Sequence, residues 1–353
     1  MALSSAEVAK IAATTITNYE RNQPQDQINV TRPLLDALLQ NPEDLSGGLD
    51  GFALNIFKSN DANGQVYSGN ARVTYNSRSP NSLAKFNWLN HHDGFVLSED
   101  ELKRNGITID DETGKKSTAT KSESFALANL MDSNMRALSE GVKDDLHSIF
   151  WRGQALLKVQ TEPSVWGIAD IVSLTPNTGT IGGIDASTNT YWQNQSANLG
   201  TTPSLATLLN GLEQMKRKIL RNNGRITHIF AGGGFIDTLR NAIVGSQQTQ
   251  VVYGNGSKLK IDMATDQLKF DGLPVIWVPS FDDWGADNSV DWTKRCYMVN
   301  LNSSIKLRRD SHDFLKMRYP GRPVDQYVYH FAMTSKAGLG CIQRNSNAVL
   351  YYS

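Results

Sequence analysis

The feature that most constrains the fold is one long amphipathic helix, predicted over residues 122–153. Apolar side chains recur there at spacings of three and four: Leu127, Leu130, Met131, Met135, Leu138, Val142, Leu146, Ile149 and Phe150. Ser122 and Glu123 can cap its start, Gly153 can end it, and Gly141 is a place where it can bend. Such a rod spans on the order of 45 Å, which exceeds the typical helix of a compact domain.

The overall composition is that of an ordinary globular protein. Of 353 residues, 39% are hydrophobic and 20% are charged, and a chain of this length fits two connected lobes. Its 35 basic residues balance 35 acidic ones, so any contact with DNA must be local. No segment approaches the roughly 20 apolar residues of a membrane span, and no signal peptide is expected.

The segments before the long helix predict an arm and a ribbon that bury too little apolar surface to be stable by themselves. A short helix over residues 4–21 precedes a proline-rich arm, whose one apolar cluster is Leu34, Leu35, Leu38 and Leu39. FALNIF and QVYSGNARVTY flank residues 60–64 and predict a β-hairpin, and a second hairpin is expected around residues 110–116. Because such a two-stranded ribbon is marginal alone, we expect arm and ribbon to lie on neighbouring molecules.

The segments after the long helix predict a mixed lobe, so the fold class is α+β. Residues 203–223 form a helix, ITHIFA a strand, and GFIDTLRNAIV a second helix. The remaining segments are predicted strands: KLKID, LKFDGLPVIWVP, RCYMVN, SIKL, YVYHFAMTS and CIQRNSNAVLYY.

Motifs that could carry chemistry are weak. AGGGF, residues 231–235, lies where a phosphate loop would, but it lacks GK[ST] and GxGxxG, which favours a structural turn. His91, His92 and Asp93 point to alternate faces of an extended segment, and Cys296 and Cys341 have no metal-ligand spacing. We therefore predict no catalytic residue, no metal site and no cofactor, and a chain that is not an enzyme.

Basic residues gather in two places. The helix dipole accounts for the cluster Lys216, Arg217, Lys218, Arg221 and Arg225. Residues 294–322 form the second cluster, for which subunit salt links, packaged DNA and a solvated face stay open. The candidate subunit-interface residues are two aromatic residues and four arginines: Phe86, Trp88, Arg308, Arg309, Arg318 and Arg322.

The order of parts, arm, extended loop, long helix and mixed lobe, resembles the tailed-bacteriophage major capsid proteins with the Hong Kong 97 fold. Several segments are similar to stretches of that family: WGIADIV, TGTIGGIDASTNTYWQNQ, KFDGLPVIWVP, CYMVNLNSSIKL and KAGLGCIQRNSNAVLYY. The resemblance covers most of residues 49–353.

The resemblance implies a division of the chain into named parts. These are an N-terminal arm at 1–48, an extended loop at 49–120, a peripheral domain at 121–200 with the spine helix 122–153, an axial domain at 201–302, a peripheral return strand at 303–335 and a C-terminal axial segment at 336–353.

The function implied is that of a shell subunit. Such subunits form hexamers and pentamers of an icosahedral head around double-stranded DNA, in a virion assembled in the host bacterial cytoplasm. The implied partners are a separate scaffolding protein, a portal protein and decoration proteins, with DNA on the inner face and no membrane. Neutralising Arg308, Arg309 or Arg318 is expected to impair assembly or packaging more than neutralising Lys115 and Lys116.

Two other functions compete with the phage capsid. One is a cellular nanocompartment shell of the same fold, and the other is a nucleotide-binding enzyme built on the strand-glycine-helix unit at 226–244.

Overall fold

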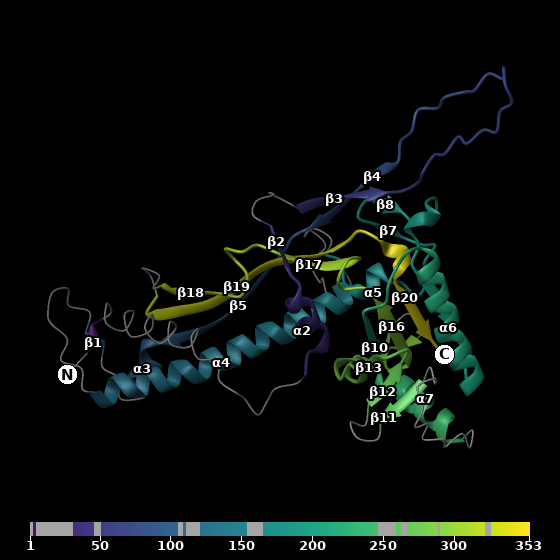
Figure 1. The fold of residues 1–353 in the computed structure, drawn as a ribbon. Helices are drawn as coiled ribbons and strands as arrows, with labels where there is room; N and C mark the ends of the chain where they lie inside the picture. Colours follow the sequence, from purple (N-terminus) through teal and green to yellow (C-terminus); the bar gives the residue numbers. More distant parts are fainter. Residues whose placement is uncertain are drawn as a thin grey trace.

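The computed structural model describes residues 3–4, 31–45, 51–104, 109–110, 121–153, 165–245, 259–262, 267–287, 290–321 and 326–353. Helix α4 (Lys121–Arg152) lies along a five-stranded sheet, and a seven-stranded sheet with its own helices sits at the C-terminal end of α4 (Figure 1). The predicted α+β class and the predicted long helix are confirmed.

Helix α4 follows from its apolar stripe and its stop signal. The side chains of Met131, Met135, Val142, Leu146 and Phe150 are fully buried, at the spacing that places them on one face. The helix ends at Gly153, whose φ of +44° is the left-handed conformation that favours glycine. A Cβ atom there would overlap the backbone of Gly167, which passes directly beside the helix end.

The five-stranded sheet covers α4 with one face. It joins β18 (Lys316–Gly321), β19 (Val328–Cys341), β17 (Ile305–Arg309) and β2 (Glu43–Asp44) in that order, and β5 (Leu89–Ser98) pairs with β19. Tyr329, Phe331 and Met333 of β19 are buried, whereas the intervening His330 is exposed. The alternation shows that one sheet face meets the core and the other does not.

Two strands cross the boundaries that the resemblance implies, and the division itself stays a prediction. Residues 89–98 were assigned to the extended loop, but β5 pairs with β19 over the register Ser98↔Val328 to Leu89↔Ala337. Its polar residues, among them His91, His92 and Asp93, hide the strand pattern. The return strand was expected to end at residue 335, yet β19 continues to Cys341 because its last residues pair with β17.

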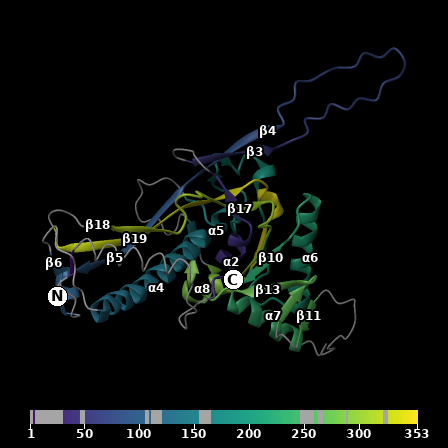
Figure 2. The ribbon, with the colours of Figure 1, turned by 60° about the vertical axis from the view of Figure 1, so that its left-hand side comes forward.

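The two-stranded ribbon joins β3 (Gly51–Phe57) to β4 (Asn81–Asn87) in antiparallel register. The predicted pairing of FALNIF with QVYSGNARVTY is therefore wrong. NSLAKFN takes its place because it buries Ala84 and Phe86 at alternate positions. Residues 58–80 form the connection, which projects away from the body (Figure 2). Of the second expected hairpin, residues 111–116 lie outside the described residues. Asp110 belongs to β6 (Ile109–Asp110), which pairs with β1 (Leu3–Ser4).

Most strands predicted for the mixed lobe lie in the seven-stranded sheet, whereas SIKL and YVYHFAMTS form β17 and β19 of the five-stranded sheet. The order of the seven-stranded sheet is β11 (Leu259–Asp262), β12 (Gln267–Phe270), β13 (Leu273–Trp277), β10 (His228–Ala231), β16 (Arg295–Val299), β20 (Ala348–Tyr351) and β9 (Gln195–Asn198). Helices α6 (Leu205–Arg221) and α7 (Gly233–Gly245) pack on one face around a second core. The other face meets the end of α4.

The remaining elements are short. They are α2 (Pro33–Gln40), α3 (Glu99–Arg104), α5 (Ile168–Ile171), α8 (Ser280–Asp283), β7 (Thr180–Ile181), β8 (Ile184–Asp185), β14 (Ala286–Asp287), β15 (Val290–Asp291) and the 3-10 turns Thr190–Trp192, Trp292–Lys294 and Arg344–Ser346.

Aromatic rings join α4 to the seven-stranded sheet. The indole ring of Trp151 lies 5.5 Å from the ring of Phe230, 4.7 Å from Phe281 and 5.3 Å from Tyr297, measured between centroids. These rings come from the end of α4, from β10, from α8 and from β16. Edge-to-face and tilted contacts of this kind favour one fixed orientation, so the rod and the sheet are held at a defined angle.

A buried arginine ties the chain's C-terminal part to the segment that follows α4. The side chain of Arg344 is fully buried, and its Nε donates to the carbonyl of Ile171 at 2.6 Å. Its other nitrogens donate to the Trp192 carbonyl at 2.9 Å and to Asn194 Oδ1 at 3.1 Å. Burial lowers the pKa of Arg344 to about 10, so the guanidinium stays charged at neutral pH.

Replacing Arg344 with methionine should lower the free energy of unfolding by about 4 kcal/mol, because three buried acceptors lose their donor. Chemical denaturation of the unassembled chain measures this change. The exposed Arg225 gives a matched control, Arg225→Met, that should stay within about 0.5 kcal/mol of the parent. Equal losses in the two variants would contradict the assignment.

Candidate functional site

The glycine turn that could have held a phosphate is filled by the protein's own carboxylate. The backbone N–H of Gly233, at the start of α7, donates to Asp282 Oδ1 at 3.1 Å, and Trp277 Nε1 donates to Asp282 Oδ2 at 3.0 Å. A Cβ atom at Gly232 would overlap the Thr293 carbonyl. Asp282 thus occupies the place that an anion would take at this helix start, which favours the interpretation as a structural turn.

The described residues show neither a metal centre nor a membrane helix. They contain no group of three or more histidine, cysteine or acidic side chains placed to share a metal ion. Among the same residues, no helix combines the length and the apolar character needed to cross a bilayer. The candidate functional site comprises the predicted interface residues and the surfaces around them.

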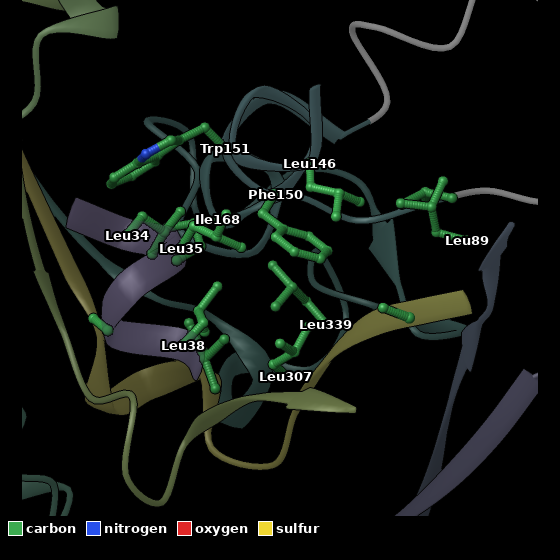
Figure 3. Close-up of a cluster of buried hydrophobic side chains, with 14 of the residues drawn as sticks. Leu34, Leu35, Leu38, Leu89, Leu146, Phe150, Trp151, Ile168, Leu307 and Leu339 are labelled. Atoms are coloured by element: carbon green, nitrogen blue, oxygen red, sulfur yellow. The ribbon is translucent and has the colours of Figure 1, made fainter. Parts of the chain in front are cut away.

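Part of the N-terminal arm is docked on its own chain. Leu34, Leu35 and Leu38 of α2 are buried between α4 and the five-stranded sheet (Figure 3). Arg32, just before α2, pairs through Nη1 with Glu140 and through Nε with Asp144, both at 2.5 Å. We expected residues 1–48 to gain their order mainly from neighbours, which is wrong for residues 31–45.

Arg308 and Arg309, two predicted interface residues, hold the end of this arm segment. Strand β2 pairs with β17, which places Glu43 beside Arg308 and Asp44 beside Arg309. Arg308 Nη2 lies 2.6 Å from Glu43 Oε2, and Arg309 Nε lies 2.6 Å from Asp44 Oδ1. The hydrogen bond from Arg309 lowers the pKa of Asp44. Arg308 is nearly buried, with its side chain 4% exposed, whereas that of Arg309 is 30% exposed.

The other described candidates also contact their own chain. Arg318 donates to Asp313 Oδ1 at 2.6 Å and to Thr334 Oγ1 at 2.9 Å. Phe86 and Trp88 are buried, and both rings lie against Phe52 at centroid distances of 5.9 and 5.0 Å. Arg322, Lys115 and Lys116 lie outside the described residues. Contact of any of these residues with a second subunit or with DNA stays a prediction.

The base of the ribbon is anchored on the five-stranded sheet. Phe52 packs over Gly338 and Gly340 of β19, where a Cβ atom would lie 3.0 and 2.8 Å from its ring. The guanidinium of Arg308 lies 5.3 Å from the same ring. On the other strand, the N–H of Lys85 donates to the Gly182 carbonyl at 2.9 Å. The ribbon therefore leaves the body in a fixed direction.

The loop tip, residues 58–80, differs sharply from that base. Its two legs are bridged by side chains: Asn63 Nδ2 donates to the Thr74 carbonyl at 3.1 Å, and Asn76 Nδ2 donates to the Asp61 carbonyl at 3.1 Å. Large apolar side chains on these legs have no cover within the described chain: Val66, Tyr67, Val73 and Tyr75. A cluster of this kind is typical of a contact surface. Sequence reasoning missed it, although Val and Tyr stand out in this Ser- and Asn-rich stretch.

A buried histidine lies under the arm segment. His147 on α4 is 2% exposed, and among the described residues neither of its ring nitrogens has a hydrogen-bond partner. Burial, together with the positive charge of Arg32, lowers its pKa to about 4, although Asp144 partly offsets this. His147 is therefore neutral at pH 7.

Comparison with solved structures identifies the architecture. No family profile and no curated protein matches the chain. The capsid of cyanophage A-1(L) matches with a TM-score of 0.58 at 13% identity, over 93% of this chain and 94% of that one. The capsid of the Myoviridae phage XM1 matches with a TM-score of 0.55 at 12% identity, over 95% and 97%. The chain has the Hong Kong 97 type capsid fold.

The capsid fold is shared with shells of another kind. The holo-SrpI encapsulin complex of Synechococcus elongatus PCC 7942 matches with a TM-score of 0.50 at 9% identity, over 95% of this chain and 94% of that one. The capsid fold therefore places the chain among shell-forming architectures without choosing between them.

Replacing Arg308 with methionine should lower the free energy of unfolding by about 2 kcal/mol, because a nearly buried cation loses contact with Glu43 and Phe52. The adjacent Arg309→Met is the control, and it should cost about 0.5 kcal/mol, since its pair with Asp44 is screened by water. Denaturant titration of both variants measures the two losses in the free energy of unfolding. A larger loss for Arg309→Met would contradict the special position of Arg308.

Acid should weaken the fold through His147. Because its pKa is near 4 in the folded state and about 6.5 unfolded, stability falls by up to about 3 kcal/mol as pH drops through this window. Thermal unfolding from pH 8 to pH 4 measures the slope. His147→Leu should remove that part of the slope, whereas replacement of the exposed His92 should leave it. Parallel slopes in parent and His147→Leu would refute this role.

Proposed function

We propose that this chain is a major capsid protein, which self-assembles into hexamers and pentamers of an icosahedral head around the double-stranded DNA of a tailed bacteriophage. The observation that carries the proposal is the extent of the fold likeness. It spans 93% of this chain and 94% of the cyanophage A-1(L) capsid chain. The likeness therefore extends over nearly the whole length of both chains.

The geometry of the loop supports assembly. Its base is anchored, so the direction in which it projects from the body (Figure 1) is set before any partner is met. Its tip presents exposed apolar side chains. Aromatic residues presented on a fixed scaffold contribute strongly to protein interfaces, since little order is lost on binding. A neighbouring subunit is the surface that the tip requires.

The proposal extends to partners and location. A separate scaffolding protein, a portal protein and decoration proteins would complete the head, with DNA on the inner face. The particle would be assembled in the host bacterial cytoplasm and end as a virion. A role as an enzyme is disfavoured, because Asp282 fills the one turn that resembled a phosphate loop.

A nanocompartment shell is the second candidate, because the encapsulin complex shares the fold. The two differ in content, since a phage head holds DNA and a nanocompartment holds protein. Nucleic-acid and protein analysis of purified particles discriminates between them, as do neighbouring genes for portal, terminase and tail proteins.

Expression of the chain with and without a co-expressed scaffold should give rings or shells in negative-stain microscopy. Tyr75→Asp at the loop tip should reduce particle yield by roughly tenfold or more, because a charge cannot be buried in an apolar contact. Tyr75→Phe is the matched control and should assemble like the parent. Persistent monomers of the parent chain would contradict the proposed function, and normal assembly of Tyr75→Asp would contradict the role of the tip.

A further inference from the structure

The seven-stranded sheet carries different surfaces at its two edges. Helix α6 lies over the β9 and β20 edge, with α7 beside it. The sheet continues past α7 through β13 and β12 to β11, and one flank of α6 reaches the β12–β13 turn, where Lys216 pairs with Asp271. Each edge therefore exposes its own set of side chains.

Toward the β11 end of the sheet, α7 and β13 line an open groove of about 540 Å³. We call it the Trp277 groove. The side chain of Trp277 is 52% exposed, and its indole nitrogen is held by Asp282 at 3.0 Å. Asp237 and Arg240 of α7 line the opposite wall, and Ile236 contributes to the apolar part. The groove thus combines an exposed aromatic face with the carboxylates of Asp237 and Asp282, which outnumber the single guanidinium of Arg240. Such a surface suits a cationic side chain with an apolar stem.

At the β9 edge, α6 exposes a basic flank. The buried face of α6 is formed by Leu208, Leu212, Met215 and Ile219, and Gly211 packs on Leu199 next to β9. Helical spacing then places Lys218 and Arg221 on the flank that faces away from α7. Both are exposed, and neither forms an ion pair within the part of the chain that the structure describes. The helix dipole stabilises them but leaves their charges unpaired.

We propose that the Trp277 groove of one copy receives the Lys218 and Arg221 flank of a second copy. The inference rests on the proposed shell function, and it names the contact between neighbours. Two different patches form a head-to-tail contact, which closes into a ring when the rotation allows. The cations then lie over the ring of Trp277 and beside Asp237 and Asp282, while their methylene stems cover the apolar wall.

Two variants of the full chain test the contact. The flank variant is Lys218→Glu with Arg221→Glu. The groove variant is Asp237→Lys with Asp282→Asn, in which the amide oxygen still accepts from Gly233. Each alone should lower particle yield by roughly tenfold or more, because like charges then face each other across the contact. Sedimentation and negative-stain microscopy measure the yield, and thermal unfolding checks that both variants remain folded.

Mixing the two variants should restore association. Each groove then meets an oppositely charged flank only when the variants alternate around a ring, so rings with an even number of subunits form and pentamers do not. Six-fold rings, sheets or tubes without closed icosahedra are the expected products. Normal shells from either variant alone would overturn the inference and leave the shell function intact, as would a mixture of folded variants that forms no rings. Absence of shells from the parent chain would overturn the shell function itself.

Discussion

The buried guanidinium of Arg308 is the point at which three distant parts of the chain meet. It belongs to β17, it pairs with Glu43 of the arm, and it lies over the ring of Phe52 at the base of the ribbon. A Cβ atom at Gly340 would come within 2.5 Å of its Nη1, so β19 must present a bare backbone there. Arm, ribbon and sheet thus all contact one nearly buried cation.

The body of the molecule packs within one chain, whereas the loop tip at residues 58–80 is exposed to contact with other molecules. The arm segment adds Leu34, Leu35 and Leu38 to the core over α4, and the rings around Trp151 set the angle of the second sheet. The body is therefore a rigid frame along the rod. The loop tip projects from this frame with its apolar side chains uncovered.

Sequence reasoning found the elements whose pattern is local. The apolar spacing in residues 122–153 predicted α4 and its end at Gly153. Each apolar strand of the mixed lobe could likewise be predicted from its own residues. Contacts between residues that are distant in the chain could not be predicted from the sequence. The leucines of α2 were visible as a cluster, but not the surface on α4 that they cover, and the capping of Gly233 by Asp282 joins residues 49 positions apart. Strand β5 was missed because its exposed face and the polar residues His91, His92 and Asp93 break the apolar alternation.

The candidate interface residues that the structure describes all contact their own chain. Their residue types therefore predicted a contact without showing whether the partner lies in the same chain or in a neighbour.

Hydrogen exchange of the chain before and after assembly tests the account most directly. It predicts slow exchange in residues 33–40 and in β3 and β4 already in the unassembled chain, with new protection in residues 58–80 only after assembly. Fast exchange of residues 33–40 before assembly, or a loop tip equally protected in both states, would contradict it.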